Sequence, residues 1–230
     1  MTAKKARQRI VNQPMHRHPR EMTPPRTGAC DNPWMIVQRE SSYVTVPWKN
    51  GGGVTREILR APPEPTAFDW RLSLATIASP GPFSTFSGYH RTLVLVGGAG
   101  VELNFGRHGA AQLQSAGQMV CFEGAWETSC TLVDGPSTDL NLIVAAERVQ
   151  SVTRSAQLAA TELIQTSGWT ETLICCISGE IRITNIAGEA EILRSVDVAR
   201  CLPGDGAITC SPQGPTAPRM FVAGLRRRNG

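Results

Sequence analysis

The stretch that decides the fold reads Trp70-Arg71-Leu72-Ser73-Leu74-Ala75-Thr76-Ile77. Successive side chains of a β-strand point to opposite faces of the sheet. Large apolar side chains recur at every second position here, and the positions between them are mostly polar or small. The alternation predicts a strand with one face in a core (Trp70, Leu72, Leu74 and Thr76) and a second, more polar face (Arg71, Ser73, Ala75 and Ile77).

Short strands and turns continue on both sides of this stretch. The chain contains 22 glycines and 16 prolines, many of them in turn signals such as Pro80-Gly81-Pro82 and Asp134-Gly135-Pro136. Many short strands at this spacing favour an all-β sandwich or barrel. The predicted strands are 34–40, 43–48, 54–60, 69–78, 91–96, 101–105, 119–123, 128–133 and 139–146.

A second strand-rich half follows at 168–226. Residues 95–103 and 176–183 both read as an apolar strand, a glycine turn and an alternating strand, which suggests an internal duplication. Between the halves, residues 154–166 show moderate apolar periodicity and predict a helical linker. The adjacent Cys175 and Cys176 are expected to face opposite sides of a strand.

Length and charge limit the function. The chain has 230 residues, 41% of them hydrophobic, which suffices for one large or two small domains. Residues 1–29 hold seven of the 23 cationic side chains and one of the 19 anionic ones. Residues 30–230 therefore hold sixteen cationic and eighteen anionic side chains. The body is therefore not basic, and nucleic acid is not an expected partner. We expect residues 1–33 to be a disordered leader, or an extension upstream of the true start.

The sequence favours a reduced, cytoplasmic environment and no membrane. It has no apolar signal-peptide region and no run of eighteen apolar residues. The seven cysteines are odd in number and lack C-x-x-C spacing, so they read as free core thiols. Outside the leader the histidines are only His90 and His108, so neither a metal nor another cofactor is expected.

One lysine stands out as a candidate binding residue. Residues 30–230 hold fifteen arginines and a single lysine, Lys49, which lies beside Trp48, Asn50 and three glycines. Lysine is a compact ammonium and is not interchangeable with the planar guanidinium at a specific site. Lys49 therefore points at a ligand or a buried carboxylate, unless it survived an arginine-rich codon usage by chance.

Two further groups of residues suggest a pocket. Asp139 and Asn141 share one face of their strand, and the loop 81–91 is rich in aromatic and hydroxyl side chains. Such residues can line a barrel lumen and wall a ligand site. The alternatives are that the polar side chains face solvent, and that the aromatic side chains only attach the loop to the barrel.

Together these motifs resemble the HutD/Ves family over about residues 34–226. The second half matches only in its strand pattern. The matching motifs are Pro47-Trp48-Lys49-Asn50-Gly51-Gly52-Gly53-x-Thr55-Arg56-Glu57, Trp70-Arg71-Leu72-Ser73-x-Ala75, Gly81-Pro82-Phe83-Ser84-x-Phe86-x-Gly88-x-x-Arg91, Asp134-Gly135 and Asp139-x-Asn141.

The resemblance implies a metal-free bicupin, with two RmlC-like jelly-roll barrels. The first barrel would span 34–150 and a linker 151–167. The second, smaller barrel would span 168–226 and be completed by strands from the first half. Because few of its charged positions are expected to face inward, we expect it to have a structural role. The family is linked to histidine utilisation as an accessory or regulator, and its Ves branch to stress response.

The resemblance also implies residue roles. Lys49 and Arg71 would bind a carboxylate, and Glu57 and Asp139 would hold the cations when no ligand is bound. His90 is equally consistent with a site residue and a surface residue. The implied ligand-binding set is Trp48, Lys49, Asn50, Gly51, Gly52, Arg71, Ser73, Phe83, Ser84, Phe86, Arg91, Asp139 and Asn141.

Three functions stay open from the sequence. The first is binding of a small carboxylate, such as N-formyl-L-glutamate, in an accessory role. The second is a metal-independent hydrolase or isomerase of an acyl-amino acid, with Asp139, Lys49, Glu57 or His90 as acid or base. The third is a protein-interaction module of a stress-response pathway. A homodimer and an unidentified regulatory partner are also left open.

Overall fold

The computed structural model describes residues 34–48, 51–64, 67–202 and 206–228. These residues form strands β1 to β19 and two single-turn 3-10 helices, η1 (Glu40–Ser42) and η2 (Gly106–His108). The strands pair antiparallel in four sheets, so the all-β prediction is confirmed. Within this part of the chain, no helix is long and apolar enough to cross a membrane.

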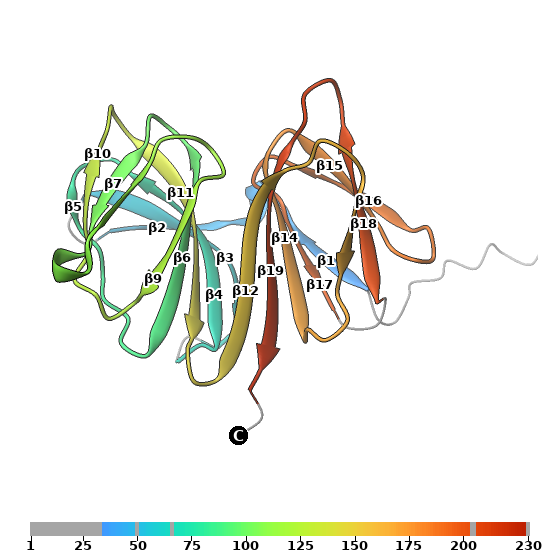
Figure 1. The fold of residues 1–230 in the computed structure, drawn as a ribbon, viewed down its shortest axis with the longest axis horizontal. Coiled ribbons are helices and arrows are strands. Elements are labelled where there is room, and N and C mark those ends of the chain that lie inside the picture. Colours follow the sequence, from blue (N-terminus) through green and yellow to red (C-terminus); the bar gives the residue numbers. More distant parts are fainter. Residues whose placement is uncertain (1–33, 49–50, 65–66, 203–205, 229–230) are drawn as a thin grey trace, which may run out of the picture. The chain divides into compact units, whose positions relative to one another are not determined.

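The first half packs two sheets around an apolar core of Leu93, Leu95, Leu103, Phe105 and Phe122, among others (Figure 1). The larger sheet has the order β2 (Val44–Pro47), β3 (Gly53–Ala61), β4 (Trp70–Ile77), β11 (Ser137–Ala145), β6 (Tyr89–Gly97) and β9 (Met119–Glu123). The smaller sheet has the order β5 (Gly81–Pro82), β10 (Ser129–Leu132), β7 (Val101–Asn104) and β8 (Ala110–Leu113).

The second half also packs two sheets around its own core, which includes Met35, Ile174, Cys176 and Met220. The five-stranded sheet has the order β1 (Met35–Gln38), β17 (Val198–Cys201), β14 (Glu171–Ser178), β19 (Arg219–Arg227) and β12 (Val149–Gln157). The four-stranded sheet has the order β13 (Glu162–Gln165), β18 (Ala207–Gln213), β15 (Glu180–Thr184) and β16 (Ala190–Arg194).

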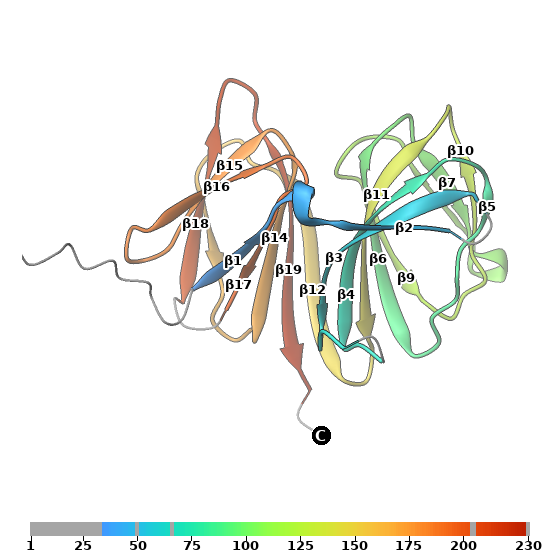
Figure 2. The same cartoon turned by 180° about the vertical axis from the view of Figure 1, so that it is seen from behind.

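The structure corrects the course of the chain in two places. The helix predicted at 154–166 is absent, because β12 pairs with β19 along its whole length and β13 pairs with β18. These long-range ladders override a modest local helical preference. The strand predicted at 34–40 does not belong to the first barrel: β1 pairs with β17, and Met35 lies opposite Cys201 (Figure 2). The expected leader at 1–33 lies outside the described residues.

A third apolar core joins the two halves. It contains Trp70, Leu72 and Leu74 from β4, together with Phe221 and Cys175 from the five-stranded sheet. The apolar face of 70–77 therefore packs against the other half of the chain, and the opposite face points into the first barrel. Cys175 lies in this joining core and Cys176 in the core of the second half, as their adjacency on one strand predicts.

Phe221→Ala is expected to destabilise the whole protein by about 3–5 kcal/mol, because Phe221 is fully buried in the joining core. Urea unfolding followed by circular dichroism measures the loss. Val152→Ala is the control: Val152 is 53% exposed on β12, and its truncation should change stability by about 0.5 kcal/mol or less. Two separate unfolding transitions in the unmodified protein would contradict a core shared by both halves.

Candidate functional site

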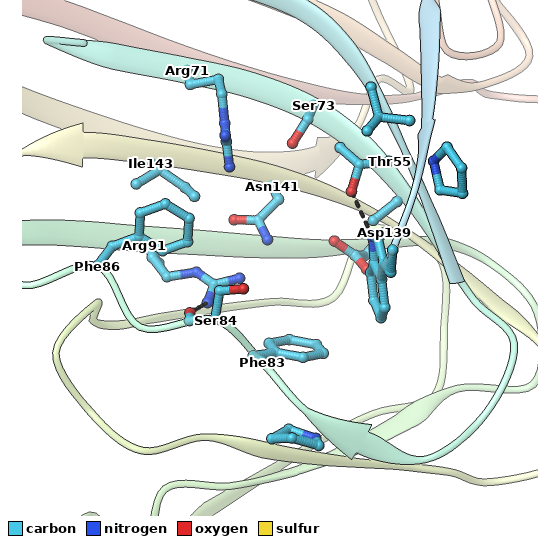
Figure 3. A pocket seen from close by; sticks show the side chains of 15 residues that line it. Thr55, Arg71, Ser73, Phe83, Ser84, Phe86, Arg91, Asp139, Asn141 and Ile143 are labelled. Carbon is cyan, nitrogen blue, oxygen red and sulfur yellow. Dashed lines mark hydrogen bonds between the residues drawn. The ribbon is translucent and has the colours of Figure 1, made fainter. Parts of the chain in front are cut away.

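A cavity of about 760 Å³ lies in the first half, between the inner face of the six-stranded sheet and residues 82–86 (Figure 3). Its size is typical of small-molecule sites. The side chains that line it come from β2 to β6, β11 and the loops beside them. They are Val46, Pro47, Trp48, Thr55, Arg71, Ser73, Ala75, Pro82, Phe83, Ser84, Phe86, Arg91, Asp139, Asn141 and Ile143.

Strand register brings the polar residues together. Arg71 on β4 lies opposite Ile143 on β11, and Ile143 lies opposite Arg91 on β6. In the same way Ser73 lies opposite Asn141, and Ala75 opposite Asp139. The exposed fractions are 3% for Ser73, 8% for Asn141 and 1% for Asp139. These side chains therefore line the lumen, and the alternative that they face solvent is wrong.

Aromatic rings hold the two arginines. The Cζ atom of Arg91 lies 5.2 Å from the ring centroid of Phe83, and Arg91 donates a hydrogen bond of 3.1 Å to the carbonyl oxygen of Ser84. The Phe86 ring lies beneath both guanidinium groups, 5.3 Å from Cζ of Arg71 and 5.6 Å from Cζ of Arg91. These are cation–π contacts, which stabilise a desolvated cation without neutralising it.

Burial shifts the protonation of the charged groups. It lowers the pKa of Arg91 to about 10, against the raising effect of Asp139, so Arg91 stays charged at neutral pH. Burial also lowers the pKa of Arg71, and nearby Glu57 opposes that shift. For Asp139 burial raises the pKa to about 7, although Arg91 favours the ionised form. Desolvation therefore outweighs the attraction between the two groups.

Four buried polar atoms in the lining side chains have no hydrogen-bond partner among the described residues. They are two donors, Nε of Arg71 and Nε of Arg91, and two acceptors, Oδ1 of Asp139 and Oδ1 of Asn141. Buried polar atoms are almost always paired, since leaving one unpaired costs about 1–3 kcal/mol. The lining is therefore suited to a polar ligand that both accepts and donates hydrogen bonds.

Trp48 closes one side of the cavity. Its Nε1 donates a hydrogen bond of 2.8 Å to Oγ1 of Thr55, and its ring meets Phe83 edge-on at 6.4 Å between centroids. Gly53 allows this position, because a Cβ there would meet the carbonyl oxygen of Thr76 and lie 3.2 Å from the Trp48 ring. A residue without a side chain at position 53 thus allows the close packing of Trp48 on β3.

The comparison with known proteins comes from both sequence and structure. Residues 40–217 match the family model HutD. The chain belongs to the HutD family. The resemblance seen in the sequence motifs is therefore confirmed.

Two curated relatives support this assignment. An uncharacterized 21.2 kDa protein from the hutC 3′ region of Pseudomonas putida is 33% identical over 177 residues, which cover 76% of this chain and 91% of that protein. The protein Ves of Citrobacter koseri is 37% identical over 110 residues, covering 47% of this chain and 57% of Ves.

Solved structures agree with the fold. HutD from Pseudomonas fluorescens, in a structure titled as a formate condition, has a TM-score of 0.72 and 30% identity and covers 85% of this chain and 100% of its own. A conserved protein of unknown function from Pseudomonas aeruginosa has a TM-score of 0.75 and 28% identity, covering 84% and 98% of the two chains. An oxalate decarboxylase has a TM-score of 0.59 at 10% identity, covers 85% of this chain and 78% of its own, and supports the cupin-like fold alone.

The structure places most, but not all, of the predicted site residues of this HutD-family chain at the cavity. Gly51 and Gly52 do not line it, and the carbonyl oxygen of Gly52 accepts a backbone hydrogen bond from Ala78 instead. Lys49 and Asn50 lie outside the described residues. The predicted residues that do line the cavity are Trp48, Arg71, Ser73, Phe83, Ser84, Phe86, Arg91, Asp139 and Asn141.

Two acid–base candidates do not line the cavity. The Nδ1 atom of His90 lies 3.0 Å from Oε1 of Glu123, and both side chains are about half exposed. Because neighbours on a strand alternate, the inward position of Arg91 turns His90 outward. Glu57 pairs with Arg60 at 3.2 Å and is not a lining residue.

Sequence reasoning missed six lining residues, most of them apolar. Ile143 could have been found, because it lies two residues after Asn141 and so shares its face. Thr55 was quoted as part of a motif but was given no role. The others carry no polar signal. The missed residues are Val46, Pro47, Thr55, Ala75, Pro82 and Ile143.

The residues of this cupin-like site do not fit a metal ion. Among the described residues, no group of three His, Cys, Asp or Glu side chains is placed to hold one. The lining contains one carboxylate, Asp139, beside two guanidinium groups. Since a cation site needs several anionic or neutral donors, this lining suits an anion instead.

Gly53→Ala is expected to destabilise the HutD-family fold by about 1–3 kcal/mol, because the added methyl group would overlap the Thr76 carbonyl oxygen and press on Trp48. Thermal unfolding measures the change. Gly97→Ala is a matched control on β6 of the same sheet, since a Cβ there meets nothing within 4 Å. Equal melting temperatures for the two variants would show that Trp48 is not held by this contact.

Proposed function

We propose that this protein is a cytoplasmic, metal-free cupin that binds a small carboxylate and has an accessory or regulatory role in histidine utilisation. The carrying observation is a pair of arginines, Arg71 and Arg91, in one aromatic-lined cavity. Neither guanidinium forms an ion pair among the described residues. A desolvated guanidinium without a direct ion-pair partner is costly, so a bound anion would stabilise it.

The cavity supports a ligand with two acceptor ends. Arg71 and Arg91 lie on strands separated by β11 alone, so their backbones are about 10 Å apart. Each guanidinium can donate to a carboxylate or carbonyl oxygen, and the rings of Phe83 and Phe86 can pack on an apolar stem. N-formyl-L-glutamate, with two carboxylates and a formamide group, has this chemistry.

The biological role draws on the relatives. The Pseudomonas putida relative is described by its position beside hutC, and the Pseudomonas fluorescens relative carries the name HutD. The formate condition named for the latter structure involves the smallest carboxylate. These names support a link to histidine utilisation. The sequence motifs contain no recognisable catalytic nucleophile, which favours binding over turnover.

Arg71→Ala should weaken the binding of N-formyl-L-glutamate by at least tenfold, because it removes charge-assisted hydrogen bonds worth about 1.5–3 kcal/mol. A proton NMR titration that follows the isolated formyl resonance measures the affinity. Arg182→Ala removes an exposed arginine of β15 and should bind as the unmodified protein does. A formyl resonance that neither broadens nor shifts at millimolar concentration would exclude this ligand.

One observation keeps an enzyme as the second candidate. Asp139 is buried in the cavity, and burial brings its pKa to about 7, which suits a general base. Of the four acid–base candidates it alone lies in the described lining, since His90 and Glu57 are not lining residues and Lys49 lies outside the described residues.

The same titration separates binding from hydrolysis. Hydrolysis would produce a growing free formate peak, and Asp139→Asn would stop that growth because it removes the base. We expect a constant total formyl signal and no formate. Formate release that survives Asp139→Asn would mean that another residue is the base.

A further inference from the structure

Arg91 and Asp139 face the same part of the cavity without touching. Figure 3 shows the guanidinium group and the carboxyl group directed toward one another from neighbouring strands. They form no ion pair, and Nε of Arg91 and Oδ1 of Asp139 both lack a hydrogen-bond partner among the described residues. A ligand group placed between them would meet both side chains at once.

Among the described residues, few charged or titratable groups surround Asp139. Its neighbours across the sheet are Ala75 on β4 and Leu95 on β6, which are apolar. Arg91 approaches from β6 and the thiol of Cys130 from β10, and burial raises the pKa of that thiol to about 12, so it is neutral. Arg71 on β4 is cationic and lowers the pKa of Arg91.

A carboxylate ligand would therefore meet a second carboxyl group beside Arg91. Two ionised carboxyl groups at one buried site repel each other strongly, so one of them takes up a proton. One guanidinium cation can balance only one of the two negative charges. Since the ligand carboxylate gains the contact with Arg91, the proton belongs on Asp139.

We propose that Asp139 binds the ligand as a neutral carboxyl group, which donates a hydrogen bond to a carboxylate oxygen that Arg91 also holds, so that binding takes up one proton from solvent. No covalent bond forms or breaks. This inference rests on the proposed function and specifies the chemistry of that site. Because two donors then face the ligand, this position selects an oxygen acceptor over the N–H group of an amide.

The direction of the pH dependence follows from linkage. In the free protein the pKa of Asp139 is about 7, and a bound carboxylate raises that pKa further. Below pH 7 Asp139 already holds its proton, so affinity changes little. Above pH 7 each binding event must take up a proton, and affinity falls by up to tenfold per pH unit.

Isothermal titration calorimetry of N-formyl-L-glutamate into the full chain tests this, at pH 6 and pH 8 in two buffers of different ionisation enthalpy. We expect an uptake near one proton at pH 8 and near zero at pH 6, with affinity about tenfold lower at pH 8. Asp139→Asn carries a permanent donor, so its uptake should be near zero and its affinity equal at both pH values.

His90→Asn is the control, because it removes a half-exposed imidazole that lies outside the cavity. It should keep the uptake of the unmodified protein. The measurement on the unmodified protein needs no variant, so it decides the question even if Asp139→Asn fails to fold.

The outcomes separate the two proposals. Binding at pH 8 without proton uptake overturns this inference and leaves the proposed function intact. Absence of both heat and any change in the formyl NMR signal, at either pH, overturns the proposed function and this inference with it. Proton uptake that persists in Asp139→Asn, or that vanishes in His90→Asn, would assign the proton to a different group. Either result would overturn this inference.

Discussion

The packing of the six-stranded sheet against the five-stranded sheet determines which way each residue of β4 and β11 points. The joining core takes Leu72 and Leu74 from β4 and Leu140 and Leu142 from β11. The residues between them must then face the first barrel. A slip of one residue in either strand would place Arg71 or Asp139 in a dry core, at a cost of several kcal/mol. Apolar packing on one face thus positions the polar site on the other.

The site packs its two guanidinium groups against aromatic rings and not into direct ion pairs. Phe86 contacts both guanidinium groups and Phe83 contacts that of Arg91, so the rings stabilise the charges without occupying their hydrogen-bond donors. The donors stay available to a ligand. Binding sites commonly accept such a local loss of stability for the sake of function, and the joining core, with its fully buried Phe221, offsets it elsewhere.

The cupin-like fold carries different chemistry in different chains. The fold shared with an oxalate decarboxylase extends over 85% of this chain at 10% identity, but the lining described above favours an anion and not a metal ion. Folds host many functions, and the function follows from the residues of the site. For the function that we propose, the decisive residues are Arg71, Arg91 and Asp139, which lie on three adjacent strands of one sheet.

The sequence by itself determined the fold class, the family and the two faces of the central strands. The faces can be read locally, because side chains alternate between the two faces of a strand in any sheet. It also pointed to Arg71, Ser73, Asp139 and Asn141, which share the inward parity. Only the tertiary structure decided that β1 joins the second half, where Met35 pairs with Cys201, and that 154–166 is extended. Those pairings are long-range, and the local sequence does not encode the partner strand. The burial of Asp139, which raises its pKa to about 7, and its approach to Arg91 arise only when three strands meet.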